Sequence, residues 1–202
     1  MARYTGPKHR HCRVEGIALC GLQTCPVIRK NAGPPGEHGQ KGRRKLSEYG
    51  IQLREKQKVK RMYGILERQF KKYYQWAAKT QGATGEALLE ILEGRLDNVV
   101  YRLHLARTRT QARQLVSHGH IHVNGKRVTI PSYNVKIGDI VSLSAKAANF
   151  DLVKKSLEES KDSTVVSWLK KEGAAAKVLE KPKREEIDLP IDERLIVEFY
   201  SR

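Results

Sequence analysis

Three cysteines and two histidines lie in the segment KHRHCRVEGIALCGLQTC, residues 8–25, and these are all the cysteines of the 202-residue chain. Thiolates and imidazoles bind metal ions such as zinc, whereas two suitably placed thiols can form a disulfide. Because three is an odd number, at least one thiol is left out of any internal disulfide. The segment is therefore an incomplete set of disulfide-forming cysteines, a metal site that a histidine completes, or a set of unrelated small apolar residues.

The charge of the chain indicates its class of partner. The net charge is +17, and residues 1–150 hold 28 Lys and Arg against 10 Asp and Glu, whereas residues 151–202 hold 11 against 12. Positive charge that served only general solubility would have no reason to be concentrated in one part of the chain. The charge therefore indicates a polyanionic partner, most simply nucleic acid. Cations near the start interrupt any apolar signal segment, and the uncharged run 16–28 is too short to cross a bilayer. We therefore expect a cytoplasmic protein with no membrane partner, and reduced thiols there disfavour the disulfide.

The elements that must position these residues follow from the apolar spacing. Residues 1–45 lack periodicity, and their Gly- and Pro-rich part, 31–45, is either a flexible linker or a cationic arm that becomes ordered on a partner. Its charge density favours the arm. Residues 47–79 have a helical pattern that Ser47 caps, and the cations of this pattern either are solvated or face RNA. A stripe of leucines and valines over residues 88–103 predicts two helices that Gly94 separates.

Polar and cationic side chains recur on the helices that follow. Arg95, Asn98 and Arg102 share the side of their helix that lies away from the apolar stripe, so we expect a polar, cationic face there. Thr108 and Gln111 have the spacing of a capping box, which starts a further helix. The outer face of that helix carries Arg109, Arg113 and Ser117.

A small antiparallel sheet comes next. Asn124 and Gly125 in IHVNGKRVTI predict a two-residue type I′ turn between two strands, and DIVSLS supplies another strand. The helix start at Thr108 and the hairpin tip at Lys126 and Arg127 offer donors for phosphate. The last fifty residues contain a helical run at 152–159 and end on a strand-like stretch, LIVEFY.

The run RLDNVVYRLHLARTRTQARQLVSHGHIHVNGKRV resembles the RNA-binding module named after small-subunit ribosomal protein S4. The resemblance to the bacterial S4 family continues in the same order over nearly the whole chain, in MARYTGP, PPGEHGQ, EKQKVKRMYGILERQFKKYY, TGEALLEILEGRLDNVVYR, VSWL and LIVEFYSR. It implies an α+β fold, in which a mostly helical N- and C-terminal domain is interrupted by an inserted helix-turn and small antiparallel sheet. We expect the basic arm and helical domain at 1–93, the module at 94–150, and a tail at 151–202 that packs back on the helical domain.

The resemblance also implies a function. Members of the family are structural constituents of the small ribosomal subunit that bind 16S rRNA at a junction in its 5′ domain and nucleate assembly of the 30S body. The implied partners are the fifth small-subunit protein, through which the family influences translational accuracy, and mRNA near the channel by which it enters.

The residue pattern agrees with that function, because proteins recognise RNA helices through shape, phosphate and 2′-OH contacts. Asp97 is assigned as an internal partner of a nearby arginine. We expect RNA backbone contacts from Arg43, Arg44, Lys45, Arg95, Asn98, Arg102, Arg107, Thr108, Arg109, Arg113, Gln114, Ser117, His118, His120 and Lys126.

Two other function classes use a similar module. Certain pseudouridine synthases and tyrosyl-tRNA synthetases join it to a catalytic domain, but this chain lacks the GxxxxGK[ST], GxGxxG, GxSxG and HxE…PCxxC motifs. It also has too little sequence outside the module for another catalytic fold, so we expect no enzymatic activity. Small nucleic-acid chaperones carry the module alone, and the similarity outside the module argues against that class.

The resemblance assigns the cysteines as well. Some members of the family hold zinc on a C-x2-C pair and a C-x4-C pair. Cys20 and Cys25 reproduce the second pair, and His9 with Cys12 takes the place of the first. The spacer between the two pairs is seven residues long, which is shorter than in the family. Because three thiolates and one imidazole form a common tetrahedral zinc set, we expect a structural Zn²⁺ on these four residues. The alternatives are a decayed site with free cysteines, or His11 or the more remote His38 as the fourth ligand.

Overall fold

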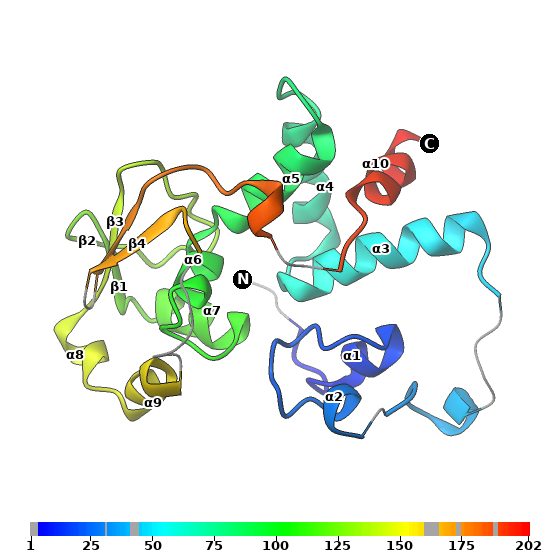
Figure 1. Cartoon of the computed structure of the whole chain (residues 1–202), viewed down its shortest axis with the longest axis horizontal. Helices are drawn as coiled ribbons and strands as arrows, with labels where there is room; N and C mark the ends of the chain where they lie inside the picture. Colours follow the sequence, from blue (N-terminus) through cyan, green and yellow to red (C-terminus); the bar gives the residue numbers. More distant parts are fainter. Residues whose placement is uncertain (1–3, 31, 41–44, 160–165, 173–174, 188–189) are drawn as a thin grey trace. The chain divides into compact units, whose positions relative to one another are not determined.

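The computed structural model describes residues 4–30, 32–40, 45–159, 166–172, 175–187 and 190–202 (Figure 1). The chain forms two compact units, Met1–Leu88 with Leu189–Arg202 and Leu89–Asp188. The first unit is helical, and the second combines helices with one antiparallel sheet, which confirms the expected α+β class. Within the described ranges, no helix is both long enough and apolar enough to cross a bilayer.

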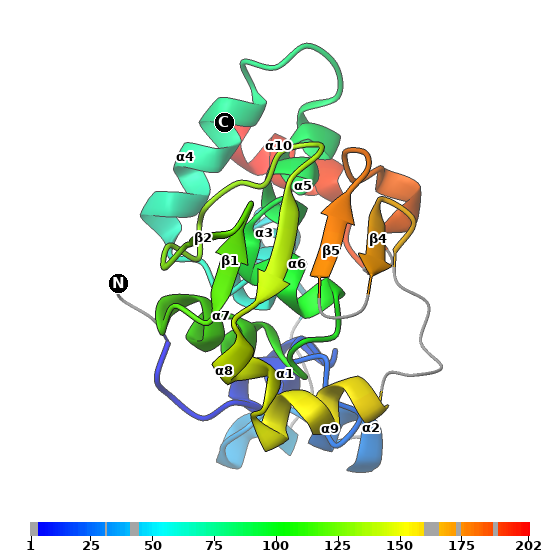
Figure 2. The same cartoon turned by 90° about the vertical axis from the view of Figure 1, so that its left-hand side faces the viewer.

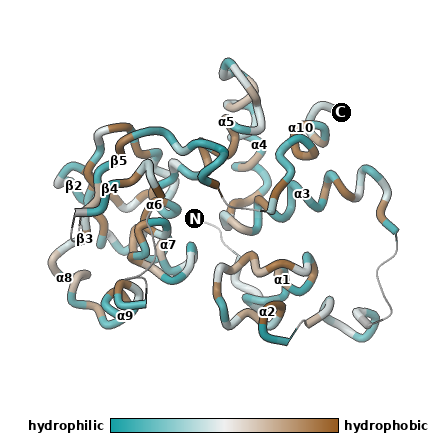
Figure 3. Tube along the Cα trace, in the orientation of Figure 1, coloured by the Kyte–Doolittle hydropathy of each residue, from teal (hydrophilic) through white to brown (hydrophobic). Residues whose placement is uncertain are grey.

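Short helices order part of the N-terminal segment that lacks sequence periodicity. They are α1 (Arg10–Glu15), α2 (Pro26–Lys30) and a 3₁₀ turn at Glu37–Gln40. Helices of one or two turns are too short to show an amphipathic period, so the sequence pattern could not indicate them. The segment that follows α1 is among the hydrophobic parts of this unit (Figure 3).

The longer helices of the first unit are α3 (Glu48–Met62), α4 (Glu67–Ala77) and α10 (Glu193–Ser201). Ser47 caps α3 as predicted, because its Oγ accepts a hydrogen bond from Gly50 N over 3.2 Å. The helical pattern of residues 47–79 is divided near Gly64, whose φ of 62° is left-handed and favours glycine. α5 (Thr84–Glu93) runs across the boundary between the two units.

The prediction of a final strand in LIVEFY is wrong, because these residues form most of α10. The Asp192 side chain caps this helix by accepting a hydrogen bond from Arg194 N over 3.0 Å. α10 packs against α3, and Ile196 is fully buried there. Tertiary burial of one helical stripe has overridden the β propensity of Ile196, Val197 and Phe199.

The second unit starts with α6 (Leu96–Arg102) and α7 (Arg109–Ser117), which pack against each other. The end of α5 at Glu93 and the separate start of α6 confirm the predicted break near Gly94. α8 (Ala145–Ala148) and α9 (Asp151–Glu159) follow the central strand of the sheet.

One antiparallel sheet completes this unit. Its strand order is β2-β1-β3-β5-β4, and the strands lie side by side in Figure 2. Their bounds are Ile121–Val123 for β1, Lys126–Arg127 for β2, Ile140–Leu143 for β3, Leu169–Glu172 for β4 and Ala175–Val178 for β5. Asn124 and Gly125 have φ values of 51° and 74°, as the predicted type I′ turn requires.

The tail is divided differently from the expected boundaries. β5 pairs with β3, so most of residues 151–188 belongs to the second unit, and the described residues 190–202 belong to the first. An unpaired β3 would leave its backbone donors and acceptors open at an edge of the sheet. Buried Trp168, Leu169 and Val178 also fill the core of this unit, which contains Leu96, Val99 and Ile121.

Candidate metal centre and nucleic-acid interface

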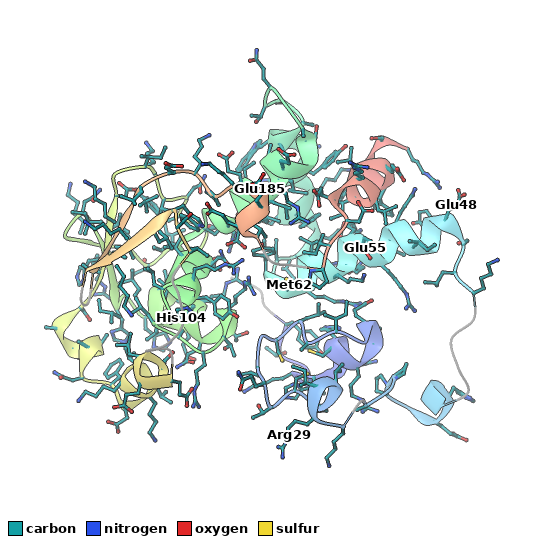
Figure 4. All side chains as sticks on the ribbon, in the orientation of Figure 1. Arg29, Glu48, Glu55, Met62, His104 and Glu185 are labelled. Atoms are coloured by element: carbon teal, nitrogen blue, oxygen red, sulfur yellow. The ribbon has the colours of Figure 1, made fainter. Side chains whose placement is uncertain are left out.

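The four residues expected to bind a metal come together in the first unit. One ligand atom from each of His9, Cys12, Cys20 and Cys25 lies within 4.8 Å of the others. His9 is the N-cap of α1 and Cys12 lies near its start, so the two-residue spacing brings both side chains to one end of a helix. Cys25 directly precedes α2. Sulfur atoms gather between these helices in Figure 4.

The geometry of this cluster fits a tetrahedral metal ion. Cys20 Sγ lies 3.7 Å from His9 Nδ1, and zinc with bonds of about 2.3 Å to sulfur and about 2.0 Å to nitrogen separates two such ligands by about 3.6 Å. Cys12 and Cys25 are buried, and His9 and Cys20 are half-buried. Four protein ligands with little exposed surface are typical of a structural metal site rather than a catalytic one.

Burial sets the electrostatics of the thiols. It raises the pKa of the Cys12 thiol to about 12, and it also raises the pKa of Cys20. Without a cation, these thiols therefore stay protonated and neutral at physiological pH. A bound divalent cation favours the thiolate form, so the donor set fits a metal with an affinity for sulfur.

The other two candidate histidines do not join the cluster. The His11 ring packs against Tyr4 with 4.3 Å between ring centroids, and burial followed by the charge of Arg61 lowers its pKa. His38 is exposed on the 3₁₀ turn and is not among the clustered residues. Within the described ranges, the geometry therefore favours His9 as the fourth ligand.

A network of buried charges joins α5 to α6. The Glu93 carboxylate is fully buried at the end of α5, and Arg102 donates two hydrogen bonds of 2.8 Å to its oxygens. Asn98 Nδ2 donates to Glu93 Oε2 over 2.8 Å, and Asn98 Oδ1 accepts from Arg109 Nε over 2.8 Å. The Arg109 guanidinium also lies over the Tyr101 ring at 4.5 Å from its centroid. Glu93 thus fixes the positions of two arginines from two helices.

A second buried acid, Asp97, also fixes the positions of two arginines. Arg95 donates two hydrogen bonds to Asp97, of 3.0 and 2.7 Å, and Arg113 Nε lies 3.3 Å from Asp97 Oδ2. The interpretation of Asp97 as an internal partner of an arginine is therefore confirmed.

The predicted outer face of α6 is only partly exposed. Arg95 and Asn98 are 2% and 1% exposed, so they lie inside the unit, whereas Arg102 keeps some exposed surface. The loop before β3 covers the start of α6, because Leu96 N donates to Tyr133 O and Asp97 N donates to Pro131 O. The expectation of a polar face open to solvent at Arg95 and Asn98 is wrong, and in this structure both residues support other side chains.

The remaining predicted residues of the second unit lie on α7, its ends and the hairpin. The Thr108 hydroxyl caps α7 by accepting from Gln111 N over 3.2 Å, and Gln111 Oε1 accepts from Arg107 N over 3.1 Å. Arg107 is exposed and pairs with Glu159, while the half-buried His120 ring meets the edge of Phe150 at 4.9 Å. Gln114, Ser117, His118 and Lys126 are exposed as well.

The arm residues are less completely described. Lys45 is exposed, and Arg43 and Arg44 lie outside the described residues. Sequence reasoning also missed the anchoring role of Glu93. A possible signal was its spacing, nine positions before Arg102, but that spacing crosses a helix break and matches no single helical face.

Comparisons with known proteins agree along the chain. The family described as "Ribosomal protein S4/S9 N-terminal domain" matches residues 3–93, and the S4 domain matches residues 94–141. The chain is 55% identical to small ribosomal subunit protein uS4 of Dictyoglomus turgidum, over the whole of both sequences. It is 53% identical to the protein of that name from Thermoanaerobacter sp. (strain X514) and 50% identical to that from Desulforamulus reducens, again over the whole of both sequences.

Proposed function

The chain belongs to the uS4 family of small ribosomal subunit proteins, and we propose that it binds 16S rRNA as a structural constituent of that subunit. It is a ribosomal protein of the cytoplasmic small subunit and not an enzyme. The observation that carries the proposed RNA site is the network in which Glu93 and Asp97 hold the arginines of α6 and α7.

This network suits the recognition of phosphate groups. In the described part of the chain, four arginines lie beside the two buried acids Glu93 and Asp97, so the arginines outnumber these acids. The side chains of Arg102, Arg109 and Arg113 are 16%, 13% and 18% exposed, so each presents an edge to the surface while its own partners fix its orientation. Planar guanidinium groups held in this way bind phosphate oxygens with little further loss of side-chain entropy.

The exposed polar residues extend this site. Gln114, Ser117 and His118 continue it along α7 and its C-terminal end, and Lys126 extends it at the hairpin. Arg107, Thr108 and His120 complete the proposed contacts of this unit. Lys45, with Arg43 and Arg44 before it, contributes from the arm.

The finer assignments rest on family membership. They are binding to the junction in the 5′ domain, nucleation of the 30S body, contact with the fifth small-subunit protein and proximity to entering mRNA. An influence on translational accuracy would follow from the contact with that protein.

Quantitative binding to protein-free 16S rRNA tests the proposal. Lys126→Gln removes one exposed cation, so it should lower the slope of log K against log salt concentration by about 0.7 to 0.9. Lys154→Gln, on the exposed side of α9, is the matched control and should leave the slope unchanged. If the protein binds bulk RNA as tightly as 16S rRNA at every salt concentration, specific rRNA binding is contradicted.

We also propose that His9, Cys12, Cys20 and Cys25 hold a structural Zn²⁺. The clustering of their ligand atoms within 4.8 Å supports this proposal. The ion would join α1 to α2 in a part of the chain that has few buried apolar side chains, so its binding energy would contribute to folding.

Metal analysis of protein refolded with zinc tests this assignment. We expect one zinc per chain in the wild type and a loss of at least half of it in His9→Ala. His11→Ala is the matched control, since it removes a neighbouring imidazole that packs on Tyr4 instead. A wild type with much less than one zinc, or a greater loss in His11→Ala than in His9→Ala, would contradict the proposal.

A further inference from the structure

The cations of α3 and α4 have different surroundings, although the two helices follow each other in one basic stretch. On α3, Lys56 and Lys60 pair with Glu67 at 2.7 and 2.9 Å, Lys58 pairs with Glu55, and Arg61 pairs with Glu15. These positive charges are therefore used within the first unit.

The cations of α4 are exposed instead. Arg68, Lys71 and Lys72 all face solvent, and the ion pairs found among the described residues include none of them. At 100° per residue they lie on the side opposite the buried Phe70 and Tyr73. Within the described residues, α4 thus presents a positive face that no acidic side chain pairs with.

An aromatic ring stands at the edge of this face, next to Lys72. Trp76 is 53% exposed, and it follows Lys72 by four residues, which places the two side chains beside each other on the helix. The Trp76 ring packs against the buried Tyr73 ring at 5.6 Å between centroids, with 57° between the planes. This contact restricts the indole while much of its surface stays open.

From these observations we propose that the α4 face, defined as Arg68, Lys71, Lys72 and Trp76, is a second RNA contact, on which an unpaired base stacks against Trp76. Nucleic acid fits this face because an exposed indole stacks on any base, while the adjacent cations neutralise the backbone phosphates. An acidic protein segment would satisfy the lysines but would gain less from a flat, exposed indole. The inference rests on the proposed function, because it adds a separate contact to the same class of partner.

Tryptophan fluorescence reports on this contact directly. The chain has two tryptophans, and Trp168 is 2% exposed in the core of the second unit. Titration of the full-length protein with protein-free 16S rRNA should therefore quench the Trp76 emission and leave that of Trp168 nearly unchanged. The same titration of Trp76→Phe identifies the residual signal, and filter binding in parallel measures the affinity independently of fluorescence.

Variants separate stacking from charge. Trp76→Gln should weaken rRNA binding about fivefold or more, since stacking on one base contributes at least that much, whereas Trp76→Phe should retain most of the affinity. Lys71→Gln combined with Lys72→Gln should lower the salt slope by about 1.4 to 1.8. Lys58→Gln combined with Lys60→Gln makes the same change in net charge on α3 and should leave the slope nearly unchanged.

The outcomes distinguish this inference from the proposed function. If 16S rRNA binds in the filter assay but Trp76 emission and the affinity of Trp76→Gln are unchanged, the α4 contact is overturned and rRNA binding stands. If Trp76→Gln binds rRNA normally but loses a protein neighbour during assembly, the face serves a protein and the inference is likewise overturned. An absence of any rRNA binding by the wild type would overturn both.

Discussion

The hydroxyl of Tyr200 donates a hydrogen bond to Glu67 Oε1 over 2.9 Å, although 133 residues separate the two in sequence. The same carboxylate accepts hydrogen bonds from Lys56 and Lys60, and Lys56 Nζ also lies 4.4 Å from the centroid of the Phe199 ring. A polar cluster therefore holds α10 on α3 and α4, in addition to the burial of Ile196.

Tyr200→Phe removes the hydroxyl and should destabilise the docking of α10 by about 1 kcal/mol, the usual net contribution of such a hydrogen bond. Hydrogen exchange of the α10 amides measures this without assuming that both units unfold together. Tyr49→Phe is the control, because it removes a hydroxyl from a ring that is 51% exposed and packs on Phe199. Equal effects of the two variants would contradict a role for the Glu67 contact.

The same cluster should make the first unit sensitive to acid. Burial alone would raise the pKa of Glu67, but hydrogen bonds from Lys56, Lys60 and Tyr200 outweigh it and lower this pKa to about 2. Since an unfolded glutamate has a pKa of about 4.3, the stabilisation is complete above that pH and is lost as the pH falls toward 2. Because the Glu67 side chain is 46% exposed, solvent screening limits the effect to about 1 kcal/mol.

The test compares wild type with Glu67→Gln between pH 6 and pH 2.5. The difference in free energy of unfolding should shrink as the pH falls through this window. A difference that stays constant would show that Glu67 does not titrate with folding.

Glu93→Gln keeps the shape of the buried side chain but removes the charge that Arg102 and Arg109 face. Breaking a buried charge cluster in this way should cost about 3 kcal/mol in thermal or urea unfolding. Affinity for 16S rRNA should fall as well, since both arginines lose their fixed position. Glu158→Gln, at an exposed position of α9, removes a charge without these effects, and similar stability of the two variants would contradict the anchoring role of Glu93.

Gly119→Ala should cause both backbone strain and a steric clash, whereas Gly125→Ala should cause backbone strain alone. Gly119 has a φ of +73°, and an added Cβ would lie 2.0 Å from Arg127 Nε, whereas Gly125 has a φ of +74° and open space around it. Both substitutions should cost about 1 kcal/mol of backbone strain. Gly119→Ala should additionally displace Arg127 from its 3.3 Å hydrogen bond to His118 O and so lower rRNA affinity. Equal stability and equal rRNA binding of the two variants would contradict this.

Local chemistry was predictable wherever it acts over a few residues. Ser47 and Thr108 cap their helices because a side-chain oxygen reaches a backbone N–H three residues later, whatever the rest of the fold does. Asn124 and Gly125 form the turn because both tolerate a positive φ. The proposed metal ligands belong to the same class, since Cys20 and Cys25 are only five positions apart.

The elements that the sequence did not predict correctly share a different physical cause. The strand predicted for LIVEFY is a helix because α3 offers α10 a surface for a helical stripe, and β4 and β5 joined the sheet because β3 had an open edge. No local pattern in these segments records a partner so distant in sequence.

The sequence by itself determined the excess of positive charge, the caps, the turn and the set of metal-binding side chains, because composition and short spacings decide these. Only the tertiary structure decided which cations are available. Arg95 is enclosed with Asp97 and Lys56 is paired with Glu67, while Lys71 and Lys72 are exposed and lack an ion-pair partner among the described residues. An arginine or lysine has the same charge in each case, and what it can bind depends on how much of its side chain the fold leaves exposed.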